Sequence, residues 1–363
     1  MSLCLIASNP QDELELKQVF FVCQELKKKG LKFFILTNPG SRLASQAKLQ
    51  AVRVINYKLE GNPGWFSTRK LERLMKKNQV QLVHFFDRTA LNSGFKAAQK
   101  AGVKVRVASW KSDWNPKDLV GLLGQLEAVI CEAEETKRLL LRNNLPASQL
   151  EIIPVGLDLS QFKGDKKDFL RKELNLSSDN FLVGLLSPLE DTRAFKNHLE
   201  ALRILEQEAP KLKIIVLGMG ALNLEMLKQE QALRMENLYF YLGFNESLAE
   251  VMSSLDLFVF GAFSLPEEFI LKAMVLKLPV VGVLPARMTE LIIHRETGLL
   301  VPPNDPPALA QAILKLYLDR SLAQTLSRQA YELVSNKHSC EAMAQKMVNH
   351  YEFLALQKGV KIG

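Results

Sequence analysis

The clearest candidates for acid–base chemistry stand at the end of one apolar run. His84 lies within the run Val80–Phe86 and Asp87 follows it directly, so both would sit near the end of a strand. An imidazole and a carboxylate at that position could act as general acid and base. A single histidine in an apolar run is also a common structural residue, and both interpretations are open.

A second candidate is the cluster Trp110, Asp113 and Trp114, which follows another apolar run. Two indole rings beside a carboxylate could form a platform on which a sugar ring stacks. Aromatic residues at this frequency also serve as core packing, which is the alternative.

Metal chemistry has no obvious ligands in this sequence. The four cysteines, Cys4, Cys23, Cys131 and Cys340, are far apart and have neither metal-ligand nor disulfide-framework spacing, and no carboxylates cluster as a metal site. We expect buried, reduced thiols and no metal cofactor.

The net charge of +8 is concentrated in the first half of the chain. Residues 1–158 hold 24 Lys and Arg against 15 Asp and Glu, and the remainder is nearly neutral. A basic first half could contact phosphate-bearing acceptors or an anionic membrane face. The alternative is solvated helix faces such as Lys27–Lys29 and Lys76–Lys77. Nucleic-acid binding is not expected, because no stacking or groove-reading motif accompanies the charge.

The elements that must position these residues alternate between apolar runs and helical patterns, as in a parallel sheet wound with helices. In the first half, strands are expected at 3–7, 32–36, 80–86, 103–108 and 128–131, and helices at 14–29, from Ser67 or Thr68 to 78, at 93–101 and at 132–143. In the second half, strands are expected at 181–186, 212–217, 238–242, 255–260 and 279–283, and helices at 198–208, 222–233, 247–253, 267–276, 307–318, 321–334 and 340–356.

These two series predict an α/β protein with two Rossmann-like domains, 1–158 and 159–338, followed by a C-terminal helix and tail, 339–363. Ligands of such sheets bind at the carboxyl ends of the strands, here in the cleft between the domains. No run approaches the roughly 20 apolar residues of a membrane-spanning helix, and Met1–Ser8 lacks secretory-signal features. We therefore expect a cytoplasmic protein.

Six segments of the second half, in the same order and spacing, resemble the large retaining, nucleotide-sugar-dependent family of GT-B glycosyltransferases (family 4-like, group 1). The resemblance implies a GT-B fold, in which the C-terminal helix packs back on the N-terminal domain. The segments are Ile152–Phe162, Lys213–Gly220, Tyr239–Gly243, Ser247–Phe260, Lys272–Val281 and Glu290–Pro303.

The resemblance implies a nucleotide-sugar site in the C-terminal domain. Its phosphate-binding pair would be Arg193 and Lys196, displaced along a lengthened loop at 187–197, and its strand-end glycines would be Gly218 and Gly220. The alternative for the basic pair is a solvated loop. Backbone amides at a helix start and a cationic side chain suit a diphosphate, so no metal is required.

Two glutamates typical of the family are missing. Ser264 and Lys272 align with them, although Glu267 or Glu268 could replace the first after a short length change. The alternative for these two carboxylates is complementing a helix dipole.

The sequence also departs from the family at other positions. Arg287 lies in place of a small glycine loop and could bind a different anionic donor, whereas Glu290 is retained. The N-terminal segment Ser8–Glu15 lacks the glycine-rich loop, and Ser109 or Trp110 aligns with the family's histidine.

The expected function is therefore transfer of a sugar, with retention, from a nucleotide-sugar to a cell-envelope glycan, lipid-linked saccharide or protein, at the inner face of the membrane. The alternative is a catalytically silent homologue that binds or scaffolds a partner transferase, because several motif residues are altered together.

Overall fold

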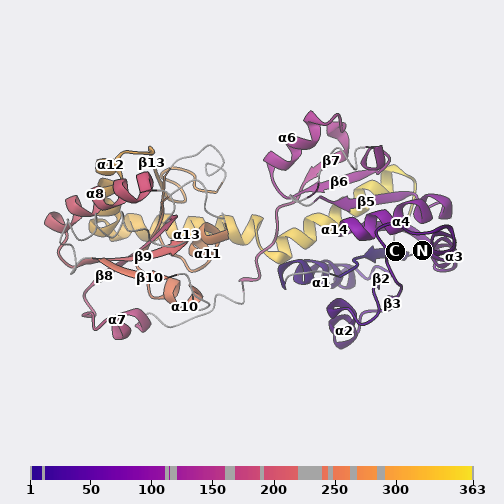
Figure 1. Cartoon of the computed structure of the whole chain (residues 1–363), viewed down its shortest axis with the longest axis horizontal. Helices are drawn as coiled ribbons and strands as arrows, with labels where there is room; N and C mark the ends of the chain where they lie inside the picture. The colour runs from indigo at the N-terminus through magenta and orange to yellow at the C-terminus, as the bar shows by residue number, and fades with distance from the viewer. Residues whose placement is uncertain are drawn as a thin grey trace. The chain divides into compact units, whose positions relative to one another are not determined.

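The computed structural model describes residues 2–9, 13–110, 114, 121–159, 168–188, 192–219, 239–243, 248–261, 268–283 and 291–361 (Figure 1). The chain divides into two compact units. Unit 1 comprises Met1–Asp158 with Lys337–Gly363, and unit 2 comprises Leu159–Asn336. Each is an α/β unit with one sheet in which every strand pair is parallel.

Unit 1 contains a seven-stranded sheet in the order β3-β2-β1-β4-β5-β6-β7. The strands are β1 (Ser2–Ile6), β2 (Phe33–Thr37), β3 (Val54–Asn56), β4 (Val80–Phe85), β5 (Val105–Ser109), β6 (Ala128–Cys131) and β7 (Leu150–Ile152). The helices are α1 (Glu13–Lys28), α2 (Arg42–Leu49), α3 (Trp65–Lys77), α4 (Arg88–Ala101), α6 (Glu134–Arg142), the 3-10 turn η1 (Ala147–Gln149) and α14 (Cys340–Gln357).

Both faces of the unit 1 sheet are buried, which is why its strands are nearly continuous apolar runs. One face packs against α3 and α4 through residues such as Leu71 and Phe95, and the other packs against α1 and α14. Helix α14 contributes Met347 and Tyr351 to that second core. The predicted return of the C-terminal helix to the N-terminal domain is thus confirmed.

A tight contact attaches α14 to unit 1. Leu157 pairs with Ser339, the Leu157 amide donates to the His338 carbonyl at 2.7 Å, and the Cys340 amide donates to the Leu157 carbonyl at 2.9 Å. A Cβ at Gly156 would lie 2.8 Å from the Cys340 amide nitrogen and closer still to its Cα. Only glycine fits this approach.

Unit 2 contains a six-stranded sheet in the order β10-β9-β8-β11-β12-β13. The strands are β8 (Phe181–Pro188), β9 (Leu212–Met219), β10 (Tyr239–Gly243), β11 (Leu257–Phe260), β12 (Val280–Val283) and β13 (Leu299–Val301). The described helices are α7 (Phe169–Glu173), α8 (Thr192–Glu208), α10 (Leu248–Ser253), α11 (Glu268–Val275), α12 (Pro306–Leu318) and α13 (Arg320–Lys337). The predicted helix 222–233 lies outside the described residues.

Several sequence expectations were wrong in detail. Helix α3 begins after Gly64, which has no side-chain cap bond, and not at Ser67 or Thr68. Helix α4 starts at Arg88, capped by Asp87, rather than at residue 93. The short elements α2, β3, η1, β7, α7 and β13 were not anticipated.

Candidate functional site

Unit 2 has a cavity of about 210 Å³ at the carboxyl ends of its strands. This is where ligands of open α/β sheets bind. The residues follow or end β11, β12 and β13 and begin the helices α8 and α12. The lining residues are Arg193, Ala194, Asn197, His198, Gly261, Val283, Pro302, Pro303, Asn304, Asp305, Pro306 and Leu309.

The two helix starts at this cavity differ in what they offer a ligand. Arg193 and Ala194 belong to the first turn of α8, so a cationic side chain and the positive end of the helix dipole lie together. Helix α12 instead opens with Pro306 and Pro307, which have no N–H, and the Asp305 carboxylate accepts from the Ala308 amide at 3.0 Å. The α8 side of the cavity is therefore the one suited to an anion.

His198 connects two strand ends at the base of the cavity. The ring is buried, with its Nδ1 3.2 Å from the Ser187 hydroxyl and its Nε2 3.0 Å from the Gly261 carbonyl. Because a carbonyl can only accept, Nε2 donates to Gly261, and Nδ1 forms the second hydrogen bond with the Ser187 hydroxyl. A Cβ at Gly261 would lie 2.5 Å from the ring, so glycine is required there.

A polar contact links the two sides of the cavity. The Asn197 side-chain amide donates to the Asn304 side-chain oxygen at 2.8 Å. Asn304 has a φ of 57°, a left-handed conformation that asparagine tolerates better than most residues. This bond joins α8 to the segment that precedes α12.

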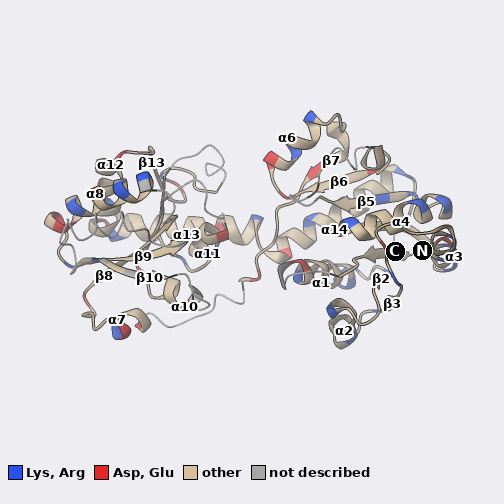
Figure 2. Cartoon of the chain, in the orientation of Figure 1, with Lys and Arg blue, Asp and Glu red and all other residues tan. Residues whose placement is uncertain are grey.

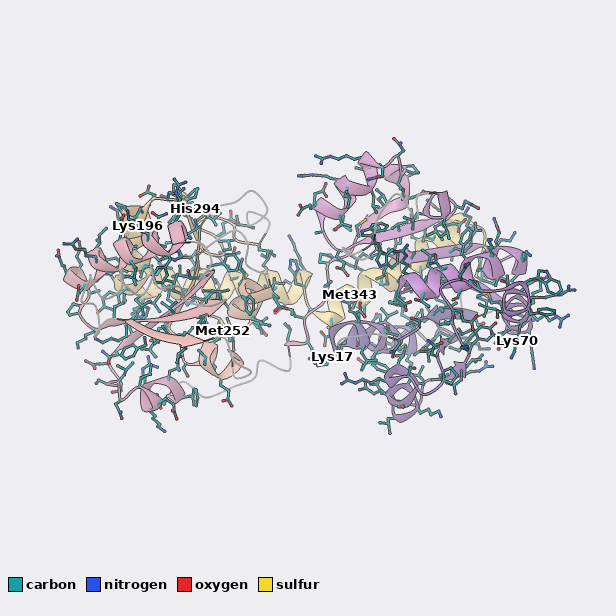
Figure 3. All side chains as sticks on the ribbon, in the orientation of Figure 1. Lys17, Lys70, Lys196, Met252, His294 and Met343 are labelled. Atoms are coloured by element: carbon teal, nitrogen blue, oxygen red, sulfur yellow. The ribbon has the colours of Figure 1, made fainter. Side chains whose placement is uncertain are left out.

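The predicted phosphate-binding pair lies on α8 and not on a lengthened loop, so the expected loop at 187–197 was wrong. Helix α8 starts at Thr192 because Phe195 is already a core residue, in helical register with Leu199 and Leu202. Arg193 lines the cavity, whereas Lys196, labelled in Figure 3, is an exposed residue of α8 outside the lining.

Three other predicted donor-site residues lie within the described residues, namely Gly218, Glu268 and Lys272. Gly218 is buried near the end of β9, in register with Ser187 and Gly243. On α11, Lys272 forms an ion pair with Glu268 at 3.3 Å, so the cation at the missing glutamate position has a carboxylate beside it. The remaining candidates lie outside the described residues. They are Gly220, Ser264, Glu267, Arg287 and Glu290.

The candidates in unit 1 have structural partners. His84 is fully buried between Tyr351 of α14 and Ser109 of β5, whose hydroxyl is 2.9 Å from its Nε2. Asp87 caps α4 at the Ala90 amide, 2.8 Å away, and accepts from the amide and hydroxyl of Ser8. These contacts occupy both side chains in holding β1, β4, β5, α4 and α14 together.

The tryptophans of the suggested stacking platform are packing residues. Trp110 and Trp114 are both buried and meet edge to face at 5.3 Å between ring centroids. The platform hypothesis is wrong for these two rings, and Asp113 lies outside the described residues. The cysteines are free and buried, as expected, and burial raises the pKa of the Cys131 thiol to about 12.

Sequence reasoning did not single out Asn197, His198, Asn304 or Asp305 as lining residues. One signal was available for the last, because an Asp followed by proline is typical of a helix start. The pairing of Asn197 with Asn304 spans 107 positions and has no local signature.

In the part of the chain that the structure describes, no group of three or more His, Cys, Asp or Glu side chains is arranged to hold a metal. Within the same residues, none of the helices is both long enough and apolar enough to cross a membrane.

Comparisons with known proteins agree with this architecture. A family model described as "Glycosyl transferases group 1" matches residues 166–333, and one described as "Glycosyltransferase Family 4" matches residues 17–161. A capsular polysaccharide biosynthesis glycosyltransferase, CapM of Staphylococcus aureus, is 23% identical over 64% of this chain and 63% of its own length. EpsF of Bacillus subtilis, a putative glycosyltransferase, is 28% identical over 55% and 56%. The chain thus spans only 49 to 63% of the length of these curated relatives.

Two solved structures resemble nearly the whole chain. A glycosyltransferase from Rickettsia africae has a TM-score of 0.72 at 17% identity, covering 97% of this chain and 98% of its own. The Anabaena protein HepE, solved with UDP, has a TM-score of 0.69 at 19% identity, covering 97% and 99%. The fold is that of the GT-B glycosyltransferases. With a family model on each half, the chain belongs to the glycosyltransferases of the group 1 and family 4 type.

Proposed function

We propose that this protein transfers a sugar from a nucleotide-sugar to a saccharide acceptor of the kind used in polysaccharide biosynthesis. The observation that carries the proposal is the unit 2 cavity, with a cationic helix start on one side and a polar, proline-rich segment on the other. Relatives named for capsular polysaccharide and amylovoran biosynthesis support the acceptor class, and HepE, which was solved with UDP and glucose, supports the donor class.

The donor would bind with its diphosphate at the start of α8. Arg193 would neutralise negative charge there, and the dipole of α8 would add to that attraction. On the opposite side, Asn304 and Asp305 offer side-chain oxygens that suit hydroxyl donors such as those of ribose.

The reaction would break the bond between the sugar carbon and the terminal phosphate, releasing the nucleoside diphosphate, and form a bond from that carbon to an acceptor hydroxyl oxygen, whose proton would pass to the departing phosphate. Negative charge grows on the leaving phosphate, so cationic groups near it stabilise the transition state more than the ground state. We propose retention at the sugar carbon, a hexose as the transferred group and independence of a metal cofactor.

Lys272 departs most clearly from the family pattern. A lysine at this position cannot accept hydrogen bonds from sugar or ribose hydroxyls, but its partner Glu268 can. The Glu268 carboxylate therefore lies one helical turn before position 272, where the family usually has a glutamate. In this proposal Glu268 substitutes for the missing acceptor.

The acceptor would be bound by unit 1 and would be a cell-envelope glycan, a lipid-linked saccharide or a protein. We propose that the reaction takes place at the cytoplasmic face of the membrane.

The decisive experiment is calorimetric titration of the full chain with UDP, GDP, ADP and CMP, followed by turnover assays with the matching nucleotide-sugars, with and without EDTA. Arg193→Gln should weaken binding of the nucleoside diphosphate about tenfold, because it removes a charge-assisted contact. Arg203→Gln is the matched control, since Arg203 is an exposed residue farther along α8.

A folded protein that binds none of these nucleotides contradicts the donor site. Binding without turnover on any donor would identify a catalytically silent homologue. Turnover that EDTA abolishes and Mg²⁺ restores would contradict metal independence.

A further inference from the structure

Helix α3 of unit 1 has an outer face of unusual composition, which we call the α3 outer face. Its residues occupy an arc of about 140° on a helix with 3.6 residues per turn. All seven are exposed, and each is aromatic or cationic. They are Trp65, Phe66, Arg69, Lys70, Arg73, Lys76 and Lys77.

The opposite face of the same helix is ordinary core. Thr68, Leu71 and Met75 are buried there, and α3 packs against α4. Folding of unit 1 therefore explains the inner face, and on the outer face it explains only the contact of the Lys70 ammonium with the Tyr57 ring, 5.9 Å from its centroid. Figure 2 shows Lys and Arg residues in the α3 region, and Figure 3 labels Lys70 on this helix.

The aromatic residues lie in the first turn. Trp65 is 56% exposed and Phe66 is 82% exposed, and their rings meet edge to face at 4.8 Å between centroids. Exposing neighbouring large apolar side chains to water is unfavourable, and exposed apolar patches mark interaction sites. The Arg69 guanidinium lies 5.1 Å from the Trp65 ring centroid, so cation and aromatic share one surface.

The charge of this face has one sign. Helix α3 is described in full, and its single acidic residue, Glu72, lies at the border of the outer face. Glu72 accepts a hydrogen bond from Lys76 at 2.7 Å, which lowers the pKa of its carboxyl group. Helix α3 has no second carboxylate that could pair with the other four cations of the face, Arg69, Lys70, Arg73 and Lys77. Lys100 of α4 adds positive charge nearby, since it also lowers the Glu72 pKa.

The geometry points to the α3 outer face as a docking surface for an anionic lipid membrane, with Trp65 and Phe66 inserted at the headgroup level. Aromatic side chains beside basic residues are typical of helices that lie in the membrane interface. Each Lys or Arg near an anionic leaflet is attracted to the lipid headgroups, and this attraction falls off within a Debye length.

A lipid surface fits this face better than a protein partner does. The face is the convex outside of a helix, and Phe66 protrudes with most of its area in solvent. A bilayer interface is fluid and moulds around protruding rings, whereas a protein partner would need a matching acidic, apolar groove. The docking surface belongs to unit 1 and is tested without any donor, so its failure leaves the proposed transferase activity untouched.

The chain contains its own reporter for the experiment. Of its three tryptophans, Trp110 and Trp114 are buried, and Trp65 is the exposed one. We expect a blue shift of tryptophan emission when the full chain is mixed with vesicles of phosphatidylglycerol and phosphatidylcholine. Vesicles of phosphatidylcholine alone should give little shift, and high salt should weaken the effect. Trp65→Phe should lose the shift but still sediment with anionic vesicles.

Two variants test the two components of the surface by vesicle sedimentation. Phe66→Ser should weaken partitioning about fivefold, and the triple change Arg69→Gln, Lys70→Gln, Arg73→Gln should weaken it about tenfold or more. The matched controls are Leu318→Ser, an exposed leucine of unit 2, and Lys48→Gln with Lys104→Gln and Lys315→Gln, exposed lysines elsewhere. Both should partition within twofold of wild type.

Absence of a shift with every vesicle would overturn the docking surface, as would equal binding to neutral vesicles. Equal losses in the controls would show a general charge or apolar effect and no defined surface. Binding to polyglutamate without vesicle binding would assign the face to an acidic protein.

Discussion

The two units have the same kind of parallel sheet but treat its carboxyl edge differently. In unit 1, the polar residues at that edge bond to one another: His84 contacts Tyr351 and Ser109, and Asp87 holds Ser8 and the start of α4. In unit 2, the edge opens into a cavity with Arg193 at a helix start. His198 of unit 2 is also held by internal partners, Ser187 and Gly261. The difference teaches that a polar residue at a strand end signals a ligand site where the edge also opens into a cavity.

The largest effect is expected where unit 1 is closed by α14. Gly156→Ala would push a methyl group into the Cys340 backbone, which cannot move aside as a side chain could, so unfolding should be easier by about 3 kcal/mol or more. Urea unfolding followed by tryptophan emission measures this, because all three tryptophans belong to unit 1. The control is Gly121→Ala, where a Cβ meets nothing within 4 Å. Equal stability of the two variants would mean that the Gly156 contact is not tight.

A smaller effect concerns pH at the same junction. Burial, with Lys346 and Lys337 nearby, lowers the pKa of His338 to about 4 from an ordinary value of 6.5. Between these values the unfolded chain binds a proton that the folded chain does not, so stability falls as the pH drops from 6.5 to 4. The loss should reach about 2 to 3 kcal/mol.

The measurement is the difference between wild type and His338→Gln, since other groups titrate in both proteins. Wild type should lose stability relative to the variant over this pH interval and remain constant relative to it below pH 4. Parallel pH profiles would show that His338 does not titrate differently on folding.

The smallest effect tests the open edge of unit 2. In a double-mutant cycle, Asn197→Ala and Asn304→Gly should be coupled by about 0.5 to 1 kcal/mol in nucleotide affinity, because each removes the same hydrogen bond. Glycine is chosen at 304 because alanine would be strained at that φ. Additive losses would mean that the bond does not organise the cavity.

The positions of the longer strands along the chain could be predicted well from the sequence, because strands buried on both faces are unbroken apolar runs such as Leu257–Phe260. Prediction failed at helix starts. The first turn of α8 has only one large apolar residue, Phe195. The start of α4 depends on Asp87, whose side chain was instead considered for catalysis. Helix α2 has only eight residues and β3 only three, so each is too short to give a strong periodic signal.

The site was predictable only in outline. The carboxyl edge of the second sheet and Arg193 followed from topology and family resemblance. Lys196 lies outside the lining because of the direction of its side chain on α8, which could not be predicted once the start of that helix was misplaced. The burial of Trp110 likewise depends on side-chain direction, which residue spacing alone does not determine. The inclusion of Asn304 depends on a contact between distant segments.

The placement of α14 also has a consequence for how the protein is made. Unit 2 is complete once residue 336 has been synthesised, whereas unit 1 still lacks the helix that covers Leu16 and Phe20. During translation unit 1 is therefore begun first but completed last. Its apolar surface stays uncovered while about 180 residues of intervening chain are synthesised. A newly made chain at that stage is expected to depend on chaperones that bind exposed apolar helices.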